Sequence, residues 1–205
     1  LGVIPRPGVS FFAPRLGCFA GVVISASHNP AEYNGIKFFD ALGYKMTPAL
    51  EAEIERRMQA DLAIPLVRSL PVFPAAERVS TYLDFLKSVF PANMDLDGVR
   101  VVVDCANGAA ALMAPKVFSG LGADVFAIGV QPDGHNINAG CGALATQALS
   151  REVRRRRAHV GIALDGDADR ALICDERGRL LDGDALIGAA AVRLLKRGGL
   201  RGRKV

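Results

Sequence analysis

Short runs of β-branched residues alternate with longer segments of helical periodicity along most of this chain. The clearest unit has a strand at residues 99–104, a turn at 105–108, a helix at 109–121 and a second strand at 123–128. A strand, a crossover helix and a further strand form the building unit of parallel and mixed sheets. The pattern therefore predicts an α/β fold in which mixed βαβ sheets carry helices on both faces.

The other expected elements continue this alternation. Strands are expected at residues 3–4, 21–24, 35–39, 160–164 and 171–174. Helices are expected at residues 7–16, from 48 onward, and at 77–90, 145–159 and 184–197. Thr47 precedes Pro48, which is the order of a hydroxyl N-cap followed by proline at the first helical position. A proline-rich stretch at residues 61–75 with little periodicity places a domain boundary near residue 76.

Composition excludes some classes of protein and leaves others open. Half of the 205 residues are hydrophobic, which is globular rather than disordered, and no apolar run reaches the length of a membrane span. The formal charge of +4 permits nucleic-acid binding without indicating it. The four arginines at residues 154–157 have no stacking aromatic beside them, so we expect a solvated helix end and no nucleic-acid partner. Four cysteines without metal-like spacing indicate free thiols in a reducing cytoplasm.

Three aspartates alternate directly after a predicted buried strand, at Asp165, Asp167 and Asp169. Two carboxylates about 4 Å apart repel by about 4 kcal/mol at an effective dielectric constant of about 20. Three in one loop therefore call for a cation, and the small residues Gly166 and Ala168 let the loop curl so that the oxygens converge. Oxygen-only ligands indicate Mg²⁺ or Ca²⁺ rather than zinc.

Two alternative interpretations of this segment need weighing. Together with Glu176, the aspartates match ligand positions of an EF-hand calcium loop, but that loop requires glycine where this chain has Arg170. The flanking segments are also β-like rather than helical, which argues against an EF-hand. A solvated acidic turn without metal stays open, although the strand before it is unusually apolar for a surface hairpin.

A second polar segment, Ser25-Ala26-Ser27-His28-Asn29-Pro30, also follows a predicted strand. A serine next to a histidine in sequence is weak support for a nucleophile–base pair, and the chain has no G-x-S-x-G elbow. Taken alone, the segment indicates a turn or a helix cap.

Taken together, the serine segment, the later Asn34-Gly35-Ile36-Lys37 and the aspartate segment resemble the α-D-phosphohexomutase family. The resemblance covers essentially the whole chain and implies a partial multidomain phosphohexomutase architecture. It assigns residues 1–76 to the C-terminal part of domain I, 77–180 to domain II and 181–205 to a truncated start of domain III. The chain starts at Leu1 and stops after a basic stretch, so we expect a piece of a longer protein.

The resemblance also implies roles for individual residues. Ser27 would carry a phosphoryl group, Lys37 matches a lysine proposed as general acid/base, Arg170 matches a residue near the transferring phosphate, and His28 belongs to the same site. The residues that would hold Mg²⁺ are Ser27, Asp165, Asp167 and Asp169. These assignments come from the match to the family motifs.

Residues 132–142 and the Ser-Ala-Ser-His form of the serine segment resemble the phosphoglucosamine mutase branch of the family. That branch implies a hexosamine phosphate substrate, a phosphoserine, a bisphosphorylated sugar intermediate and a place in cell-wall precursor synthesis. Two alternatives stay open: the same chemistry on mannose or glucose phosphates, and a catalytically incomplete metal-binding fragment.

Two observations limit the match. Arg6 stands where the family usually has a small hydroxyl residue before Pro7. The chain also lacks counterparts of the family's sugar-reading loop in domain III and of its phosphate clamp in domain IV. If the 205 residues are the whole molecule, we expect weak mutase turnover or none, with metal and phosphate binding retained.

Overall fold

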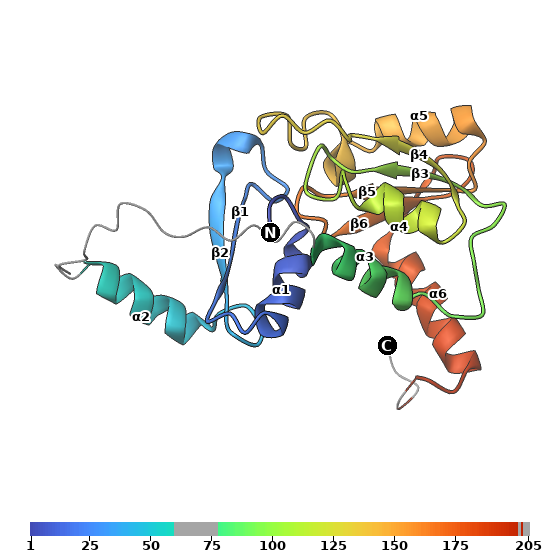
Figure 1. Cartoon of the computed structure of the whole chain (residues 1–205). Helices are drawn as coiled ribbons and strands as arrows, with labels where there is room; N and C mark the ends of the chain where they lie inside the picture. The colour runs from blue at the N-terminus through green and yellow to red at the C-terminus, as the bar shows by residue number, and fades with distance from the viewer. Residues whose placement is uncertain (60–77, 201, 203–205) are drawn as a thin grey trace.

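The computed structural model of the chain describes residues 1–59, 78–200 and 202, so the predicted boundary near residue 76 lies outside the described part. Its helices are α1 (Arg6–Arg15), α2 (Pro48–Gln59), α3 (Val79–Ser88), α4 (Ala114–Gly120), α5 (Gln147–Arg156) and α6 (Gly183–Lys196). Its strands are β1 (Gly21–Ser25), β2 (Gly35–Phe39), β3 (Arg100–Asp104), β4 (Asp124–Ile128), β5 (Val160–Leu164), β6 (Ala171–Cys174) and β7 (Leu180–Leu181). These elements form a two-stranded ribbon and a five-stranded sheet (Figure 1).

The ribbon pairs β1 with β2 in antiparallel register, so that Lys37 lies opposite Val23 and Gly35 opposite Ser25. Helix α1 packs on one face of the ribbon through a core that includes the buried side chains of Phe12 and Phe39, which are 3% and 4% exposed. The same core takes in Tyr82 of α3, which ties the ribbon to the next part of the chain.

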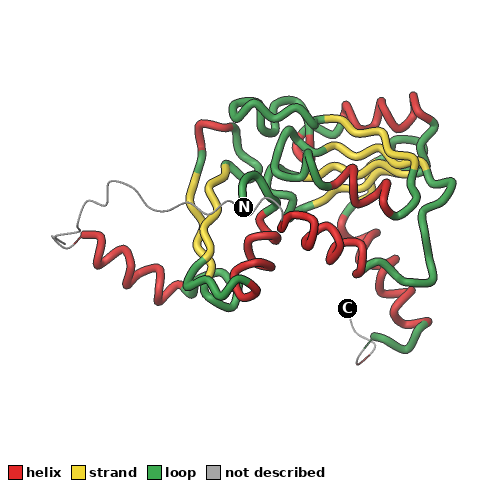
Figure 2. The backbone as a smooth tube through the Cα atoms, viewed as in Figure 1, coloured by secondary structure: helices red, strands yellow, loops and turns green. Residues whose placement is uncertain are grey.

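The five-stranded sheet has the strand order β4-β3-β5-β6-β7, and its strands lie side by side in yellow in Figure 2. Strand β3 is parallel to both β4 and β5, while β6 and β7 are each antiparallel to the strand before them. This confirms the predicted mixed sheet. Because β3 and β5 are parallel neighbours, their carboxyl ends meet at one edge of the sheet, where open α/β sheets usually bind ligands.

Helices cover both faces of this sheet, as the sequence predicts. On one face, Val102 of β3 packs with Leu149 and Val153 of α5. On the other face, the next residue, Val103, belongs to a cluster that includes Phe118 of α4. Successive residues of a strand point to opposite faces, so the unbroken apolar run of β3 serves both layers.

Several sequence-based boundaries need correction. Residues 3–4 do not form a strand, and the helix expected at 109–121 begins only at Ala114, because residues 109–113 form turns that connect to the end of the sheet. Thr47 caps α2 as expected, through a hydrogen bond from the Leu50 amide to its Oγ1 (3.4 Å). None of the residues of α2 is buried among the described residues.

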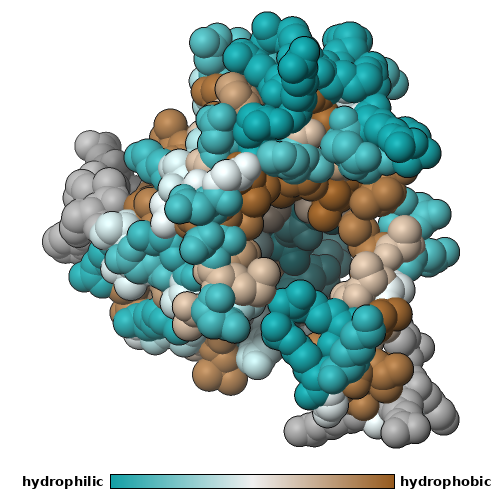
Figure 3. All heavy atoms as spheres, turned by 90° about the vertical axis from the view of Figure 1, so that its right-hand side faces the viewer, coloured by the Kyte–Doolittle hydropathy of each residue, from teal (hydrophilic) through white to brown (hydrophobic). Residues whose placement is uncertain are grey.

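Helix α6 likewise buries no side chain against the described residues. Its exposed hydrophobic side chains include Ile187, Val192 and Leu195. Figure 3 views the side of the five-stranded sheet and shows hydrophobic residues around a hollow in that face. The described residues therefore leave an apolar surface uncovered at this end of the molecule.

The remaining compositional features take simple structural forms. The four cysteines are free thiols, and all but Cys18 are buried. At the end of α5, Arg155 and Arg156 both donate to the Glu152 carboxylate, so two of the four arginines form ion pairs within their own helix. No helix in the described ranges is long and apolar enough to cross a membrane.

Asp104 ends β3 and is fully buried. Its Oδ1 accepts the Ala106 amide (2.9 Å), and its Oδ2 has no hydrogen-bond partner among the described residues. Burial raises the pKa of Asp104 above its usual value, against opposing backbone hydrogen bonds from Ala106 and Gly142. The folded chain thus holds this proton more tightly than the unfolded chain. The stability from protonated Asp104 is complete below the ordinary aspartate pKa and is lost as pH rises through the raised value.

We therefore expect Asp104→Asn to raise the free energy of unfolding at neutral pH by about 1–2 kcal/mol, because a neutral amide avoids the desolvation penalty of a buried carboxylate. The gain should shrink at a pH of about 4, where Asp104 is protonated more fully. Urea unfolding of both proteins at the two pH values measures the difference. A loss of stability at neutral pH in the variant contradicts the assignment.

Candidate active site

The serine segment forms a tight loop at the end of β1. Ser27 adopts a left-handed backbone conformation (φ 59°), which costs a non-glycine residue about 1 kcal/mol. Its amide donates to Oγ of Ser25 (2.9 Å), and the Asn29 amide donates to the Ala26 carbonyl (2.9 Å). Residues in such conformations concentrate at functional sites, where the surrounding structure holds them in place.

The aspartate segment forms a second tight loop, between β5 and β6. Asp165 is 1% exposed, and its Oδ1 accepts the amides of Asp169 (3.1 Å) and Arg170 (3.2 Å). Ala168, at the turn, is also left-handed (φ 56°). Asp165 therefore closes its own loop, which accounts for a carboxylate at this buried position.

The two loops touch at Gly166. A Cβ atom added to Gly166 would overlap the Ser27 carbonyl oxygen and come within 2.5 Å of the Ile137 side chain. The Gly166 carbonyl accepts the Ala109 amide (2.9 Å), which fixes the loop to the turn after β3. Segments more than 100 residues apart thus meet at the carboxyl ends of β3 and β5.

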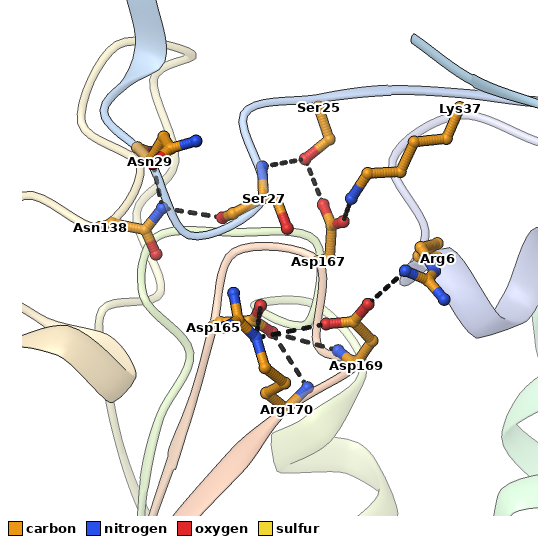
Figure 4. Close-up of polar contacts among 10 residues, drawn as sticks. All are labelled: Arg6, Ser25, Ser27, Asn29, Lys37, Asn138, Asp165, Asp167, Asp169 and Arg170. Atoms are coloured by element: carbon orange, nitrogen blue, oxygen red, sulfur yellow. Dashed lines mark hydrogen bonds and ion pairs between the residues drawn. The ribbon is translucent and has the colours of Figure 1, made fainter. Parts of the chain in front are cut away.

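Asn138 binds the serine loop from the side of residues 129–142. Its Nδ2 donates to the carbonyl oxygens of Ser27 and Asn29, each at 2.9 Å (Figure 4). Its own amide donates to the Ala106 carbonyl (2.8 Å), and its φ is 60°, a conformation that asparagine tolerates better than most residues. Asn138 therefore holds the serine loop against the five-stranded sheet.

Each of the three aspartates pairs with a separate cation (Figure 4). Lys37 and the Ser25 hydroxyl both bind the carboxylate of Asp167. Nη1 of Arg6 lies 2.6 Å from Oδ2 of Asp169, and Nε of Arg170 lies 3.2 Å from Oδ2 of Asp165. Two of these cations, Lys37 and Arg6, come from the ribbon and α1, and only Arg170 comes from the loop itself.

These surroundings shift the pKa values of Asp167 and Asp169 in opposite directions. Burial opposes ionisation of Asp167, but hydrogen bonds from Lys37, Ser25 and Ser27 and the charge of Lys37 hold its pKa below the usual value. Burial and the nearby Asp165 carboxylate raise the pKa of Asp169, and Arg6 opposes that rise. Of Asp167 and Asp169, Asp169 is therefore the carboxylate whose negative charge is less well compensated.

The three carboxylates face separate cations and do not converge on one point. No group of three or more histidine, cysteine, aspartate or glutamate side chains is arranged to hold a metal ion within residues 1–59, 78–200 and 202. The carboxylates repel one another and instead turn toward Lys37, Arg6 and Arg170. The donor set still fits a hard divalent cation by type, since carboxylate and hydroxyl oxygens are its preferred ligands.

The remaining predicted residue, His28, lies next to this network without joining it. His28 follows Ser27 in the loop, and its Nδ1 is buried with no hydrogen-bond partner in the described part of the chain.

A cavity of about 420 Å³ borders Asp167 and is also lined by Arg6, Ser25, Asn107, Pro132 and Ile137. Its volume is that of a small-molecule site.

Three residues of this network, Ser25, Asn138 and Arg6, were not predicted as site residues from the sequence. Ser25 and Asn138 carry no signal by themselves, although an asparagine in a glycine-rich loop is a frequent left-handed residue. Arg6 attracts attention only as a departure from the family pattern. The contacts that define all three join distant segments, so only the fold shows them.

Comparison with known proteins finds matches along most of the chain. Residues 1–64 match the family model of phosphoglucomutase/phosphomannomutase, alpha/beta/alpha domain I, and residues 80–178 match domain II of the same family. A phosphoglucosamine mutase of Anaeromyxobacter is 44% identical over 100% of this chain and 45% of its own length. One of Bordetella petrii is 49% identical over 98% of this chain and 45% of its own length.

Solved structures share the fold. A phosphoglucomutase/phosphomannomutase family protein from Burkholderia thailandensis aligns with a TM-score of 0.74 at 22% identity, covering 95% of this chain and 43% of that one. An Aspergillus fumigatus N-acetylphosphoglucosamine mutase, solved with GlcNAc-6P and magnesium, aligns with a TM-score of 0.54 at 19% identity, over 96% of this chain and 53% of that one. The chain spans about 45% of the length of the curated relatives named above.

Proposed function

The chain belongs to the phosphoglucomutase/phosphomannomutase family, and we propose that this protein is a phosphoglucosamine mutase that interconverts glucosamine 6-phosphate and glucosamine 1-phosphate. The identity of 44–49% to proteins of that name supports the choice of sugar. The cavity beside Asp167 offers a place for the sugar phosphate. We further propose that the protein acts in the cytoplasm and supplies amino sugars for the cell wall. Free thiols are typical of such a reducing compartment.

The contact between the serine loop and the aspartate loop carries the proposed chemistry. It places the strained Ser27 beside three carboxylates and three cations at the carboxyl ends of β3 and β5. Phosphoryl transfer depends mainly on positioning and charge neutralisation. A site rich in both charges, next to a serine held in one conformation, supplies these two requirements.

The proposed reaction is an exchange of phosphoryl groups between Ser27 and the sugar. A hydroxyl oxygen of the sugar monophosphate forms a bond to phosphorus as the bond from phosphorus to Oγ of Ser27 breaks. The sugar hydroxyl gives up its proton, and Oγ of Ser27 takes one up. The resulting bisphosphate turns over and returns its other phosphoryl group to Ser27 by the reverse step, which yields the isomeric monophosphate.

The chain's own residues have distinct parts in this exchange. Lys37, which forms an ion pair with Asp167, is proposed as the group that moves a proton at the transferring oxygen. Arg170 presents a guanidinium fork that is 53% exposed and free to meet a phosphate, and His28 lies in the same loop as Ser27. Magnesium, when bound by Ser27, Asp165, Asp167 and Asp169, would polarise the phosphoryl group.

The decisive test is phosphorylation of Ser27 in the protein at its full coding length. After incubation with glucosamine 1,6-bisphosphate, intact mass should show one added phosphoryl group on the wild type and none on Ser27→Ala. Mutase activity of Ser27→Ala should fall by about 1000-fold or more, as expected for loss of a covalent catalyst. Ser119→Ala is the control, because this hydroxyl donates to the Lys116 carbonyl within its own helix α4.

Substrate comparison tests the choice of sugar. The rate with glucosamine 6-phosphate should exceed the rates with glucose 6-phosphate and mannose 6-phosphate. Equal or higher rates with the latter two reject the amino-sugar assignment while leaving the phosphoserine chemistry in place. Full activity of Ser27→Ala rejects the chemistry itself.

A further inference from the structure

Arg6 connects α1 to the aspartate loop through both its backbone and its side chain. Its amide donates to the Asp167 carbonyl (3.0 Å), and its Nη1 lies 2.6 Å from Oδ2 of Asp169. Its guanidinium also lies 5.9 Å from the centre of the Phe39 ring. Because Arg6 is the first residue of α1, the helix fixes where this positive charge sits.

The charge balance of the loop explains why a cation is needed there. Three carboxylates within five residues repel one another, and two of them, on Asp165 and Asp167, are buried at 1% exposure. Arg170 and Lys37 neutralise these two. Asp169 is left, and Arg6 is its closest cation, with Nε of Arg170 further away at 3.9 Å.

Of the three aspartates, Asp169 has the side chain most accessible to solvent and therefore to an arriving metal ion. The Asp169 side chain is 18% exposed and the Arg6 side chain 34%, whereas Asp167 beneath Lys37 is 1% exposed. Arg6 lines the cavity of about 420 Å³ beside Asp167, so its side chain has space to move into. A divalent cation bound to the Asp169 carboxylate would compete with the Arg6 guanidinium for the same negative charge and would repel it.

We propose that Arg6 is an internal counter-ion that neutralises Asp169 while no divalent cation is bound, and that metal binding to the aspartate loop displaces it. Arg6 then has two opposite effects, both of which rest on the metal-binding part of the proposed function. It stabilises the metal-free protein, and it weakens the apparent affinity of the loop for Mg²⁺. A residue with a purely structural role would support both the fold and the metal site.

Arg6→Ser separates these effects. A contacting arginine changes the affinity of an aspartate for a proton by about tenfold or more, and we expect a change of similar size for Mg²⁺. Calorimetric titration of the full-length protein with Mg²⁺ should show binding to Arg6→Ser that is roughly tenfold tighter than binding to the wild type. Thermal melting in chelator should show the variant melting at a lower temperature.

Arg15→Ser is the matched control. It removes the same charge from the same helix, but its side chain bonds the Phe11 carbonyl (3.0 Å) and lies over the Phe11 ring, away from the aspartates. This control should leave Mg²⁺ affinity unchanged. A matching gain in affinity for Arg15→Ser would assign the effect to overall charge and overturn the proposal.

The remaining outcomes are also decisive. Tighter Mg²⁺ binding with a less stable metal-free protein, seen for Arg6→Ser alone, supports the proposal. Binding by the wild type with equal or weaker binding by Arg6→Ser overturns it and leaves the proposed function untouched. No binding by either protein removes the metal site and this proposal together, whereas phosphorylation of Ser27 tests the serine chemistry separately.

Discussion

Replacing Gly166 with alanine should separate the serine loop from the aspartate loop and reduce phosphorylation of Ser27 by tenfold or more, since small misplacements of reacting groups have effects of about 100-fold. The added methyl group would overlap the Ser27 carbonyl oxygen and press on the Ile137 side chain. Backbone atoms cannot rotate away, so the loops must move apart. Gly166 does not need glycine for its backbone conformation, because it is not among the residues with positive φ.

The expected loss of stability is about 1–3 kcal/mol, as for other overpacked positions. Intact mass after incubation with the bisphosphate measures phosphorylation, and urea unfolding measures stability. Gly188→Ala in α6 is the matched control, because a Cβ atom there meets nothing within 4 Å. This control should keep full phosphorylation and gain up to about 1 kcal/mol from helix propensity. Equal phosphorylation in both variants would show that the loops do not depend on this contact.

Four of the five strands of the sheet could be predicted because their signals are local, whereas the two-residue strand β7 is too short to leave a pattern. The run at residues 101–103 is apolar on both faces, and the structure accordingly places helices on both sides of β3. The helix expected at residues 109–121 starts late because its first residues serve the loop contact, with the Ala109 amide bound to Gly166. A tertiary contact overrides helix propensity at that point.

The candidate site was predictable only in part. Ser27, Asp165, Asp167 and Asp169 stand out because short polar motifs follow apolar strands. Their partners do not, since the ion pair from Arg6 to Asp169 spans most of the chain. Charge repulsion suggested a metal, but side-chain cations meet the same need in this structure, and sequence spacing cannot distinguish the two solutions.

Replacing Lys37 with methionine should destabilise the protein by about 3 kcal/mol, because removing one partner of a buried ion pair leaves the other charge uncompensated. Asp167 is 1% exposed, and within the described part of the chain only the hydroxyls of Ser25 and Ser27 would remain as its side-chain partners. Methionine keeps the unbranched apolar stem of lysine, so the variant removes the charge with little loss of packing. The free energy of unfolding in urea measures the effect.

The double variant of Lys37→Met and Asp167→Asn distinguishes loss of charge compensation from loss of packing. If the uncompensated carboxylate causes the damage, Asp167→Asn should restore about 1–3 kcal/mol to Lys37→Met, the range of coupling energies between contacting residues. Lys45→Met is the control, because Lys45 and Glu51 form a pair at 3.7 Å with side chains 68% and 41% exposed. Exposed pairs contribute about 1 kcal/mol or less, so this variant should stay close to the wild type. Equal losses for the two lysine variants, or no rescue by Asp167→Asn, would mean that Lys37 does not serve as the charge partner of Asp167.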